Sequence, residues 1–385
     1  MSRIIEKICY ACILTILSNS AICQDVINVY YGDYELSLSY HNFPFTEDSS
    51  SFTNKMKGAN ESLLMNDLMI IKKEFKLNDW YYYQLLDQLS RSVYGHEDEQ
   101  FNLRTLLKWY LLNRSGYDAR IVNVYGLYGL FILSEWDIVN SIEIEGVDNE
   151  KFIPLNVATL LIDSVLTIND PPKTNAQLFS LELDYPRSIE SKQDHIIECQ
   201  IGDSVLNLET FEEFDLMFLL EQYPSLEDNN RLFNIDFSEN TTQGIITTLK
   251  SVLVSDQLSN VIFLYDYVHR ISLNDDLSDS WFGYKRKLIP ELVIYYGGGD
   301  LLDKSGLLYA LMKKLLDLPL IILENPLNED EVVIGVYVEG LEYKGLEYNE
   351  RKYLILDLRE EKLDLENPPK RSYVGYTVTG SYLSK

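Results

Sequence analysis

The cysteines of this 385-residue chain are gathered at its start: Cys9, Cys12 and Cys23 lie within the first 23 residues, and only Cys199 follows. If the first 23 residues are removed, the chain keeps one thiol, so it can form neither an intramolecular disulfide nor a zinc site built on cysteines. Its fold must therefore rest on buried apolar surface. With 46% hydrophobic and 12% aromatic residues, the sequence has enough apolar side chains to form the cores of two or three domains.

The first 23 residues have the features of a secretory signal peptide. Arg3 and Lys7 are basic, residues 8–17 form a short apolar run, and small residues lead to Cys23. The run is shorter than the roughly 20 residues that span a bilayer, and no later segment is long and apolar enough, so we expect no transmembrane segment. A lipid anchor on Cys23 is the alternative to a cleaved form, although Ile22 departs from the lipobox pattern.

The chain is strongly acidic, with a formal net charge of −27. Nucleic acids and anionic membrane surfaces repel such a chain, so we expect neither as partners. Histidine offers no metal site, because no HxxxH or HExxH motif joins any of the four: His41, His96, His195 and His269. We therefore expect no cofactor.

Alternating apolar and polar residues predict strands, and apolar spacings of three and four predict helices. In the first half the expected order is strands at 28–40, helices at 60–75, 79–90 and 101–114, and hairpins at 127–156. Asn78 or Asp79 is the expected cap of the second helix, and Gly116 the expected end of the third.

The middle of the chain is rich in strands and turns, with a hairpin at 195–209. Cys199 and His195 lie in this hairpin and are expected to be structural, because nothing in the pattern activates the thiol. The last third then predicts, in order, helices at 238–255 and 256–273, a strand at 291–296, a helix from 301, and strands at 319–325, 331–340 and 352–358.

These elements predict an α+β protein. The expected divisions are a signal peptide at 1–23, an N-terminal α+β domain at 24–156, a β-rich middle domain at 157–240 and a C-terminal domain at 241–385. No low-complexity linker separates them, so we expect the domains to pack on one another.

Three consecutive glycines, 297–299, join the apolar run ELVIYY to the strongly helical run that starts at 301. The segment GGDLLDKS, with Lys304 and Ser305 at its end, matches the spacing of a phosphate loop. Asp303, however, stands where such a loop has its second glycine, and an antiparallel hairpin follows instead of repeated parallel units. A phosphate loop is therefore disfavoured.

Thiol enzymes of the papain type begin a helix with cysteine, because the helix N-terminus lowers the thiol pKa. The following strands then supply a histidine and an aspartate that orients it. The order here is the same: a glycine-rich turn, a helix, a strand at 331–338, and a strand that ends at Asp357.

The segments LNDWYYYQLL at 77–86, TLLKWYLLNRSGYDARI at 105–121 and WFGYKRKLIPELVIYY at 281–296 resemble the large exported transglutaminase-like proteins of Gram-negative bacteria, within the papain-like superfamily. That family has a turn of the form S/G-D-C-E-D-R/K-S, and this chain has GDLLDKS at 299–305. The resemblance implies a transglutaminase-like C-terminal domain with a helix packed on an antiparallel sheet. It also implies export, to the periplasm, the outer membrane or the outside of a Gram-negative cell.

The chain departs from the family at the catalytic positions. Leu301 stands at the cysteine position, Glu331 at the histidine position, and Asp357 at the aspartate position, followed by Leu358 and Arg359 where the family has proline and threonine. Leucine forms no thioester, and no histidine follows His269, so the resemblance implies a catalytically inactive protein. We expect it to bind a protein or peptide.

The expected cleft also includes Tyr296, the acidic Asp300 and Asp303, Lys304 as a surface ion-pair partner of these two, and Ser305 as a helix-surface or capping residue. The alternative function is a hydrolase or a Ca²⁺-binding protein that uses four carboxylates of this cleft: Asp300, Asp303, Glu331 and Asp357. A purely architectural envelope component is a third interpretation. The sequence does not indicate an oligomeric state.

The chain also contains a candidate internal repeat. Residues 105–122 and 306–323 share one pattern of helix, short stop and strand. The N-terminal domain is thus a candidate degenerate copy of the same transglutaminase-like core.

Overall fold

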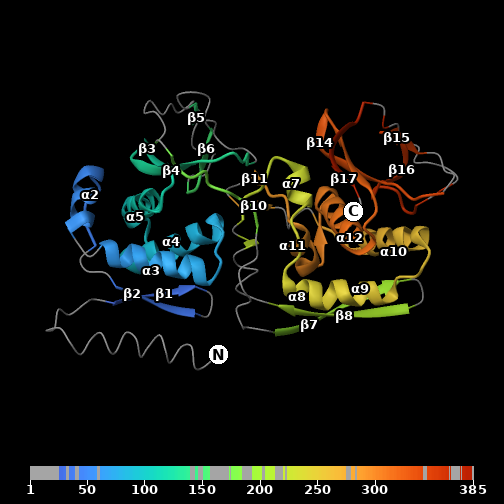
Figure 1. Ribbon diagram of the computed structural model, residues 1–385, viewed down its shortest axis with the longest axis horizontal. Coiled ribbons are helices and arrows are strands. Elements are labelled where there is room, and N and C mark those ends of the chain that lie inside the picture. The colour runs from blue at the N-terminus through green and yellow to red at the C-terminus, as the bar shows by residue number, and fades with distance from the viewer. Residues whose placement is uncertain are drawn as a thin grey trace.

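The structure is a computed structural model with two lobes that lie side by side (Figure 1). It describes residues 26–31, 34–39, 43–58, 61–138, 144–145, 151–156, 173, 175–183, 193–201, 204–212, 220–221, 223–274, 279–281, 284–340, 345–363, 365, 373 and 375–383. The predicted signal peptide at 1–23 lies outside these residues. No helix within the described part of the chain is long and apolar enough to cross a membrane.

The N-terminal lobe combines helices with two antiparallel sheets. Its elements are β1 (Val26–Tyr31), β2 (Tyr34–Ser39), α2 (Ser49–Gly58), α3 (Glu61–Glu74), α4 (Asp79–Tyr94), the 3₁₀ turn η1 (Asp98–Gln100), α5 (Phe101–Arg114), β3 (Ala119–Val124), β4 (Leu127–Leu133), β5 (Ile144–Glu145) and β6 (Lys151–Pro154). β1 pairs with β2, and the second sheet has the order β3-β4-β6-β5. The predicted helices and strands of this region are confirmed.

Local signals set the ends of these helices. Asn78 caps α4, and its side-chain oxygen accepts a 2.8 Å hydrogen bond from the backbone N–H of Tyr81. Gly116, with φ of +99°, follows the end of α5, where a residue with a side chain would be strained. Both predicted helix boundaries are confirmed.

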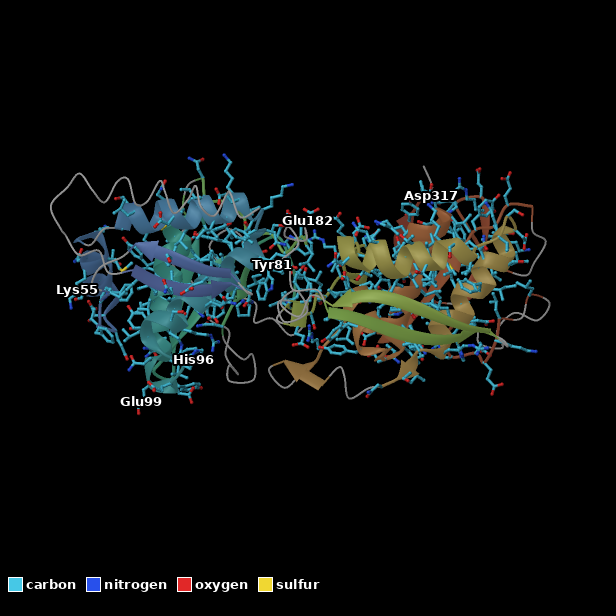
Figure 2. The ribbon with its side chains drawn as sticks, turned by 90° about the horizontal axis from the view of Figure 1, so that it is seen from below. Lys55, Tyr81, His96, Glu99, Glu182 and Asp317 are labelled. Carbon is cyan, nitrogen blue, oxygen red and sulfur yellow. The ribbon has the colours of Figure 1, made fainter. Side chains whose placement is uncertain are left out.

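A hairpin from the middle of the chain packs on the C-terminal lobe. β7 (Gln193–Ile201) and β8 (Ser204–Glu212) form the predicted hairpin, which runs across this lobe when it is seen from below (Figure 2). It lies against α8 (Glu239–Thr241), the π-helical turn η3 (Thr242–Ile246) and α9 (Thr247–Val252). Cys199 and His195 lie in β7, whose side chains are outside the described part of the structure.

The residues that follow this hairpin hold the two lobes together. Tyr223 makes an edge-to-face contact with Trp80 of α4. In α7 (Asn229–Phe233), the guanidinium of Arg231 lies 4.3 Å from the ring centre of Trp136. The short segment that carries Tyr223 and Arg231 therefore links the C-terminal lobe to the N-terminal lobe.

The C-terminal lobe is a five-stranded antiparallel sheet with helices against one face (Figure 1). Its further elements are α10 (Gln257–Arg270), β9 (Ser272–Leu273), β10 (Asp279–Trp281), β11 (Tyr284–Lys285), α11 (Pro290–Tyr296), β12 (Gly298–Gly299), α12 (Leu301–Leu316), β13 (Leu320–Asn325), β14 (Asn328–Val336), β15 (Leu346–Tyr348), β16 (Arg351–Leu356) and β17 (Thr377–Tyr382). The strand order is β15-β16-β14-β13-β17, and α12 packs against β14. The α+β prediction is confirmed.

One predicted strand is wrong. The run 291–296 belongs to the helix α11, with Pro290 in its first turn and Gly297, at φ of +60°, as its left-handed end. Proline fits the first turn of a helix because no N–H is needed there. The run is apolar without helical alternation because packing buries most sides of this short helix, and uniform burial erases the periodic signal.

The two lobes repeat one arrangement. In each, a helix precedes a hairpin, and two further strands extend the sheet in the same order: β3-β4-β6-β5 and β13-β14-β16-β15. The first strands begin at Ala119 and Leu320 and the second strands at Leu127 and Asn328, so both pairs are 201 positions apart (320 − 119 and 328 − 127). This is the offset of the repeat expected from residues 105–122 and 306–323. β17 is an additional strand on the outer edge of β13.

Candidate functional site

The glycine-rich turn fixes the start of α12. The side chain of Asp300 accepts a 2.8 Å hydrogen bond from the N–H of Asp303, and the side chain of Asp303 accepts one of 3.1 Å from the N–H of Asp300. A Cβ atom on Gly299 would lie 3.0 Å from the Cβ of Asp303, so the glycine allows this close turn. The first residue of the helix is then Leu301, the position at which the resemblance expects a nucleophile.

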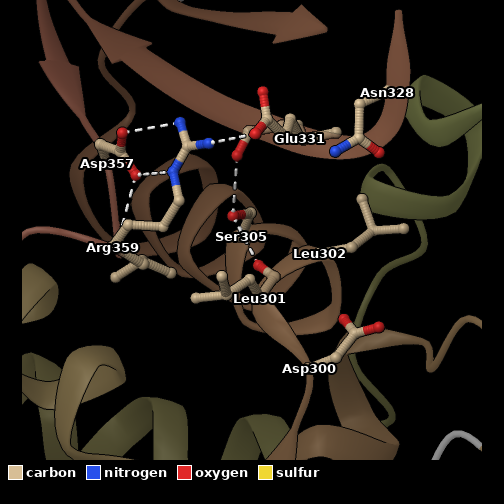
Figure 3. Close-up of a pocket in the computed structure, with 10 residues that line it drawn as sticks. Asp300, Leu301, Leu302, Ser305, Asn328, Glu331, Asp357 and Arg359 are labelled. Carbon is tan, nitrogen blue, oxygen red and sulfur yellow. Dashed lines mark hydrogen bonds and ion pairs between the residues drawn. The ribbon is translucent and has the colours of Figure 1, made fainter. Parts of the chain in front are cut away.

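A pocket of about 230 Å³ opens beside this helix start (Figure 3). Three segments line it: the start of α12, the start of β14 and the residues that directly follow β16. Its apolar lining consists of Leu301, Leu302, Val332 and Leu358. Its polar lining consists of Asp300, Ser305, Asn328, Glu331, Asp357 and Arg359.

The pocket brings together the three residues that the resemblance aligns with catalytic positions: Leu301, Glu331 and Asp357. Glu331 lies in an irregular stretch of β14, because the pairing with β13 shifts register between Glu324 and Asn325. Such an irregularity re-aims a side chain that a regular strand would direct elsewhere.

Arg359 joins two of the pocket carboxylates. Its Nε and Nη2 atoms each lie 2.7 Å from an oxygen of Asp357, and its Nη1 atom lies 3.1 Å from Glu331. The hydroxyl of Tyr373 donates a 2.9 Å hydrogen bond to Asp357, and that of Tyr376 donates one of 2.9 Å to Glu331. Both carboxylates are therefore held by a guanidinium and a phenol (Figure 3 shows the guanidinium).

This network favours the ionised forms of Asp357 and Arg359. Burial alone would raise the pKa of Asp357, but hydrogen bonds from the side chain and the backbone of Arg359 outweigh burial and lower the pKa. Burial also opposes the charge on Arg359, yet its hydrogen bonds to Asp357 and Tyr376 raise its pKa above the usual value. Burial and the charge of Asp357 raise the pKa of Tyr373, so this phenol stays protonated and remains a donor.

Ser305 lines the pocket, but its hydroxyl is engaged in the helix. Its Oγ atom donates a 2.8 Å hydrogen bond to the carbonyl of Leu301 and lies 3.3 Å from the carbonyl of Val332. No base contacts this hydroxyl among the hydrogen bonds of the described residues. Ser305 is buried and Asp300 is the cap of α12, so the expected helix-surface or capping role of Ser305 is wrong.

Three of the expected cleft residues do not line the pocket: Tyr296, Asp303 and Lys304. Asp303 is fully buried and accepts a 2.7 Å hydrogen bond from the backbone N–H of Leu288, so it faces away from the pocket. The hydroxyl of Tyr296 donates to the carboxylate of Glu221. The four-carboxylate cleft is thus reduced to three members.

The surface ion pair expected for Lys304 is wrong. Its side chain is buried, and its Nζ atom donates hydrogen bonds of 2.9 and 2.8 Å to the carbonyls of His269 and Ile271 at the end of α10. A cation stabilises the C-terminal carbonyls of a helix. Burial lowers the pKa of Lys304 to about 8, and helical spacing alone gave no signal of this contact.

The described histidines do not line the pocket. His96 lies in the N-terminal lobe (Figure 2), and His269 stacks on Tyr265 with ring centres 5.9 Å apart. The hydroxyl of Tyr265 donates to the carbonyls of Asp357 and Glu360, at 2.7 and 2.8 Å. This aromatic pair therefore anchors the loop that carries Arg359.

The N-terminal lobe has an asparagine at the place of Asp357. Asn156 lies 201 positions before Asp357 (357 − 156), at the end of the corresponding strand. Its side chain accepts a 2.6 Å hydrogen bond from the N–H of Leu130 and donates one of 2.7 Å to the hydroxyl of Thr105 in α5. This side chain therefore ties the helix to its sheet.

Within the described residues, no group of three or more His, Cys, Asp or Glu side chains is arranged to hold a metal ion. Comparisons with protein-family models, with curated proteins and with solved structures found no match.

Proposed function

We propose that this protein is a catalytically inactive member of the transglutaminase-like fold that binds a segment of a partner protein or peptide in the α12 pocket. The observation that carries the proposal is the meeting of Leu301, Glu331 and Asp357 in one pocket. Their positions follow the order of nucleophile, base and orienting acid on a helix start and two strands. If the resemblance were accidental, there would be no reason for these three residues, which lie far apart in the sequence, to line one pocket.

The chemistry of the pocket favours binding over turnover. An acyl-transfer site needs a nucleophile and a base within hydrogen-bond reach of each other. Here the aliphatic side chain of Leu301 stands at the nucleophile position, and Arg359 holds the carboxylate of Glu331 at the base position. A concave site with an apolar lining and a few oriented polar groups is typical of ligand binding.

The alternative is a hydrolase or a Ca²⁺-binding protein that uses Asp300, Asp303, Glu331 and Asp357. Two contacts weigh against it. Asp303 is committed to the N–H of Leu288, and the single positive charge of Arg359 is already paired with both Glu331 and Asp357. A calcium ion needs six to eight oxygen ligands with lone pairs to offer.

We extend the proposal to the rest of the chain. The shared strand order and the common offset support an N-terminal lobe that is a degenerate copy of the same core, with Asn156 as the counterpart of Asp357. The signal-like residues 1–23 support export, to the periplasm or the outer surface of a Gram-negative bacterium.

Binding to an array of synthetic peptides of random sequence tests the function. We expect the purified protein to retain a subset of peptides, and Leu301→Trp, which fills the pocket with a ring, to lose them. Leu383→Arg is the matched control, because Leu383 is exposed and does not line the pocket. Equal retention by wild type and Leu301→Trp would place binding elsewhere and contradict the proposal.

Assays for thiol-dependent acyl transfer and for hydrolysis of peptides and glycans test the inactive state. We expect no turnover in either assay. Turnover that Glu331→Ala or Asp357→Ala abolishes would overturn the proposal in favour of the enzyme alternative.

A further inference from the structure

Arg359 lies in the pocket, although the sequence pattern assigns no functional role to its position. It follows Asp357 by two residues, and the backbone N–H of Arg359 also donates a 3.0 Å hydrogen bond to this carboxylate. Its side chain is only 13% exposed, and that of Asp357 only 1%. A paired guanidinium with so little contact with water is held firmly, because both groups have given up hydration for each other.

The negative charges of the pocket are offset in part from within the chain. Arg359 lies against Asp357 and Glu331. Asp300 lies at the N-terminus of α12, where the helix dipole stabilises a negative charge. An incoming cation would have to compete with the guanidinium for both of its carboxylates, and an incoming anion would meet three carboxylates.

We propose that Arg359 determines what the pocket binds: it serves as a built-in counter-ion that excludes cations and reserves the pocket for an uncharged peptide segment with an aliphatic side chain. The peptide nature of the ligand rests on the proposed function, whereas the exclusion of cations does not.

The shape and lining of the pocket fit such a segment. Its volume of about 230 Å³ and its four aliphatic lining residues suit one branched side chain with its adjoining backbone. The side-chain amide of Asn328 lines the pocket and is exposed. A side-chain amide offers both a donor and an acceptor, as a peptide backbone requires.

The inference is tested with terbium(III), a luminescent substitute for Ca²⁺, on the full chain. Tyr373 and Tyr376 contact the two carboxylates, so a terbium ion held there is excited through their rings. Arg359→Met removes the counter-ion. Arg351→Met is the matched control, because Arg351 lies on β16 against Tyr337 and does not line the pocket. The double variant Arg359→Met with Glu331→Gln removes one of the released ligands.

We expect Arg359→Met to gain saturable tyrosine-sensitised luminescence with a dissociation constant of about 10⁻⁴ M, the weak end of protein calcium sites. Wild type, Arg351→Met and the double variant should show only the shallow response of an acidic surface. Identical titrations of wild type and Arg359→Met would overturn the inference. If circular dichroism shows that Arg359→Met does not fold, Arg359→Gln replaces it, with the same expected and refuting outcomes.

A second arm uses peptides that differ only at a central leucine, lysine or glutamate. We expect wild type to bind the leucine peptide about tenfold more tightly than the other two, a difference of ~1.4 kcal/mol, and Arg359→Met to shift its preference toward lysine. A wild-type preference for lysine would overturn the inference. If no peptide binds while the terbium results are as expected, the peptide-binding function fails and the exclusion of cations by Arg359 stands.

Discussion

Replacing Asp303 by alanine tests whether its carboxylate has a structural role or belongs to the binding cleft. The side chain accepts two backbone hydrogen bonds, from Leu288 at 2.7 Å and from Asp300 at 3.1 Å, and it is fully buried. Asp303→Ala removes half of the capping box at the start of α12. It also leaves the N–H of Leu288 without its acceptor in a buried place.

The loss of stability follows from these two contacts. Removing a helix-capping interaction costs about 1 kcal/mol, and a buried donor left without a partner costs about 1–3 kcal/mol. We therefore expect Asp303→Ala to lower the free energy of unfolding by about 2–4 kcal/mol. Asp256 caps α10 with the same kind of hydrogen bond but is exposed to solvent, so Asp256→Ala should cost clearly less.

Urea unfolding followed by circular dichroism measures both variants against wild type. Equal losses for Asp303→Ala and Asp256→Ala would refute the assignment of a buried double acceptor. An unchanged free energy of unfolding in Asp303→Ala, together with altered pocket binding, would restore Asp303 to the cleft.

Three further outcomes are expected. Gly306→Val should lower the free energy of unfolding by about 1–3 kcal/mol in urea, because a Cβ atom there would lie 2.7 Å from the ring of Phe233; an unchanged value would contradict this packing. The pKa of Lys304 is lowered from 10.5 to about 8, so the unfolded state binds more protons between these values, and wild type should gain stability relative to Lys304→Met as pH rises through that window. Parallel pH profiles of the two proteins would count against the burial of the charged amine. Leu301→Cys places a thiol at the start of α12, so its alkylation by iodoacetamide should show a midpoint below the free-thiol pKa of about 8.5, whereas Leu383→Cys should titrate normally; equal midpoints would argue against activation by the helix.

Much of the fold can be predicted from local sequence, because helix caps and hydrophobic periodicity act over a few residues. Asn78 and Gly116 set helix ends where the pattern placed them, and the strands of the β13–β14 hairpin follow their apolar runs. The prediction fails at 291–296, where burial on most sides of a short helix removes the periodic signal. The offset of 201 between the lobes was present in the sequence, but the common strand order became visible only in the sheets.

Some features of the candidate site likewise follow from the sequence, and others only from the tertiary structure. The sequence alone determined that position 301 carries no nucleophile and that no histidine follows His269, because these are matters of residue identity. Only the tertiary structure decided which charges meet. It brought Arg359 onto Glu331 and Asp357, turned Asp303 toward Leu288 and buried Lys304 against the end of α10. Spacing along a chain fixes the face of a helix or strand on which a side chain lies, whereas its partner depends on how distant elements pack, and that packing is a property of the whole fold.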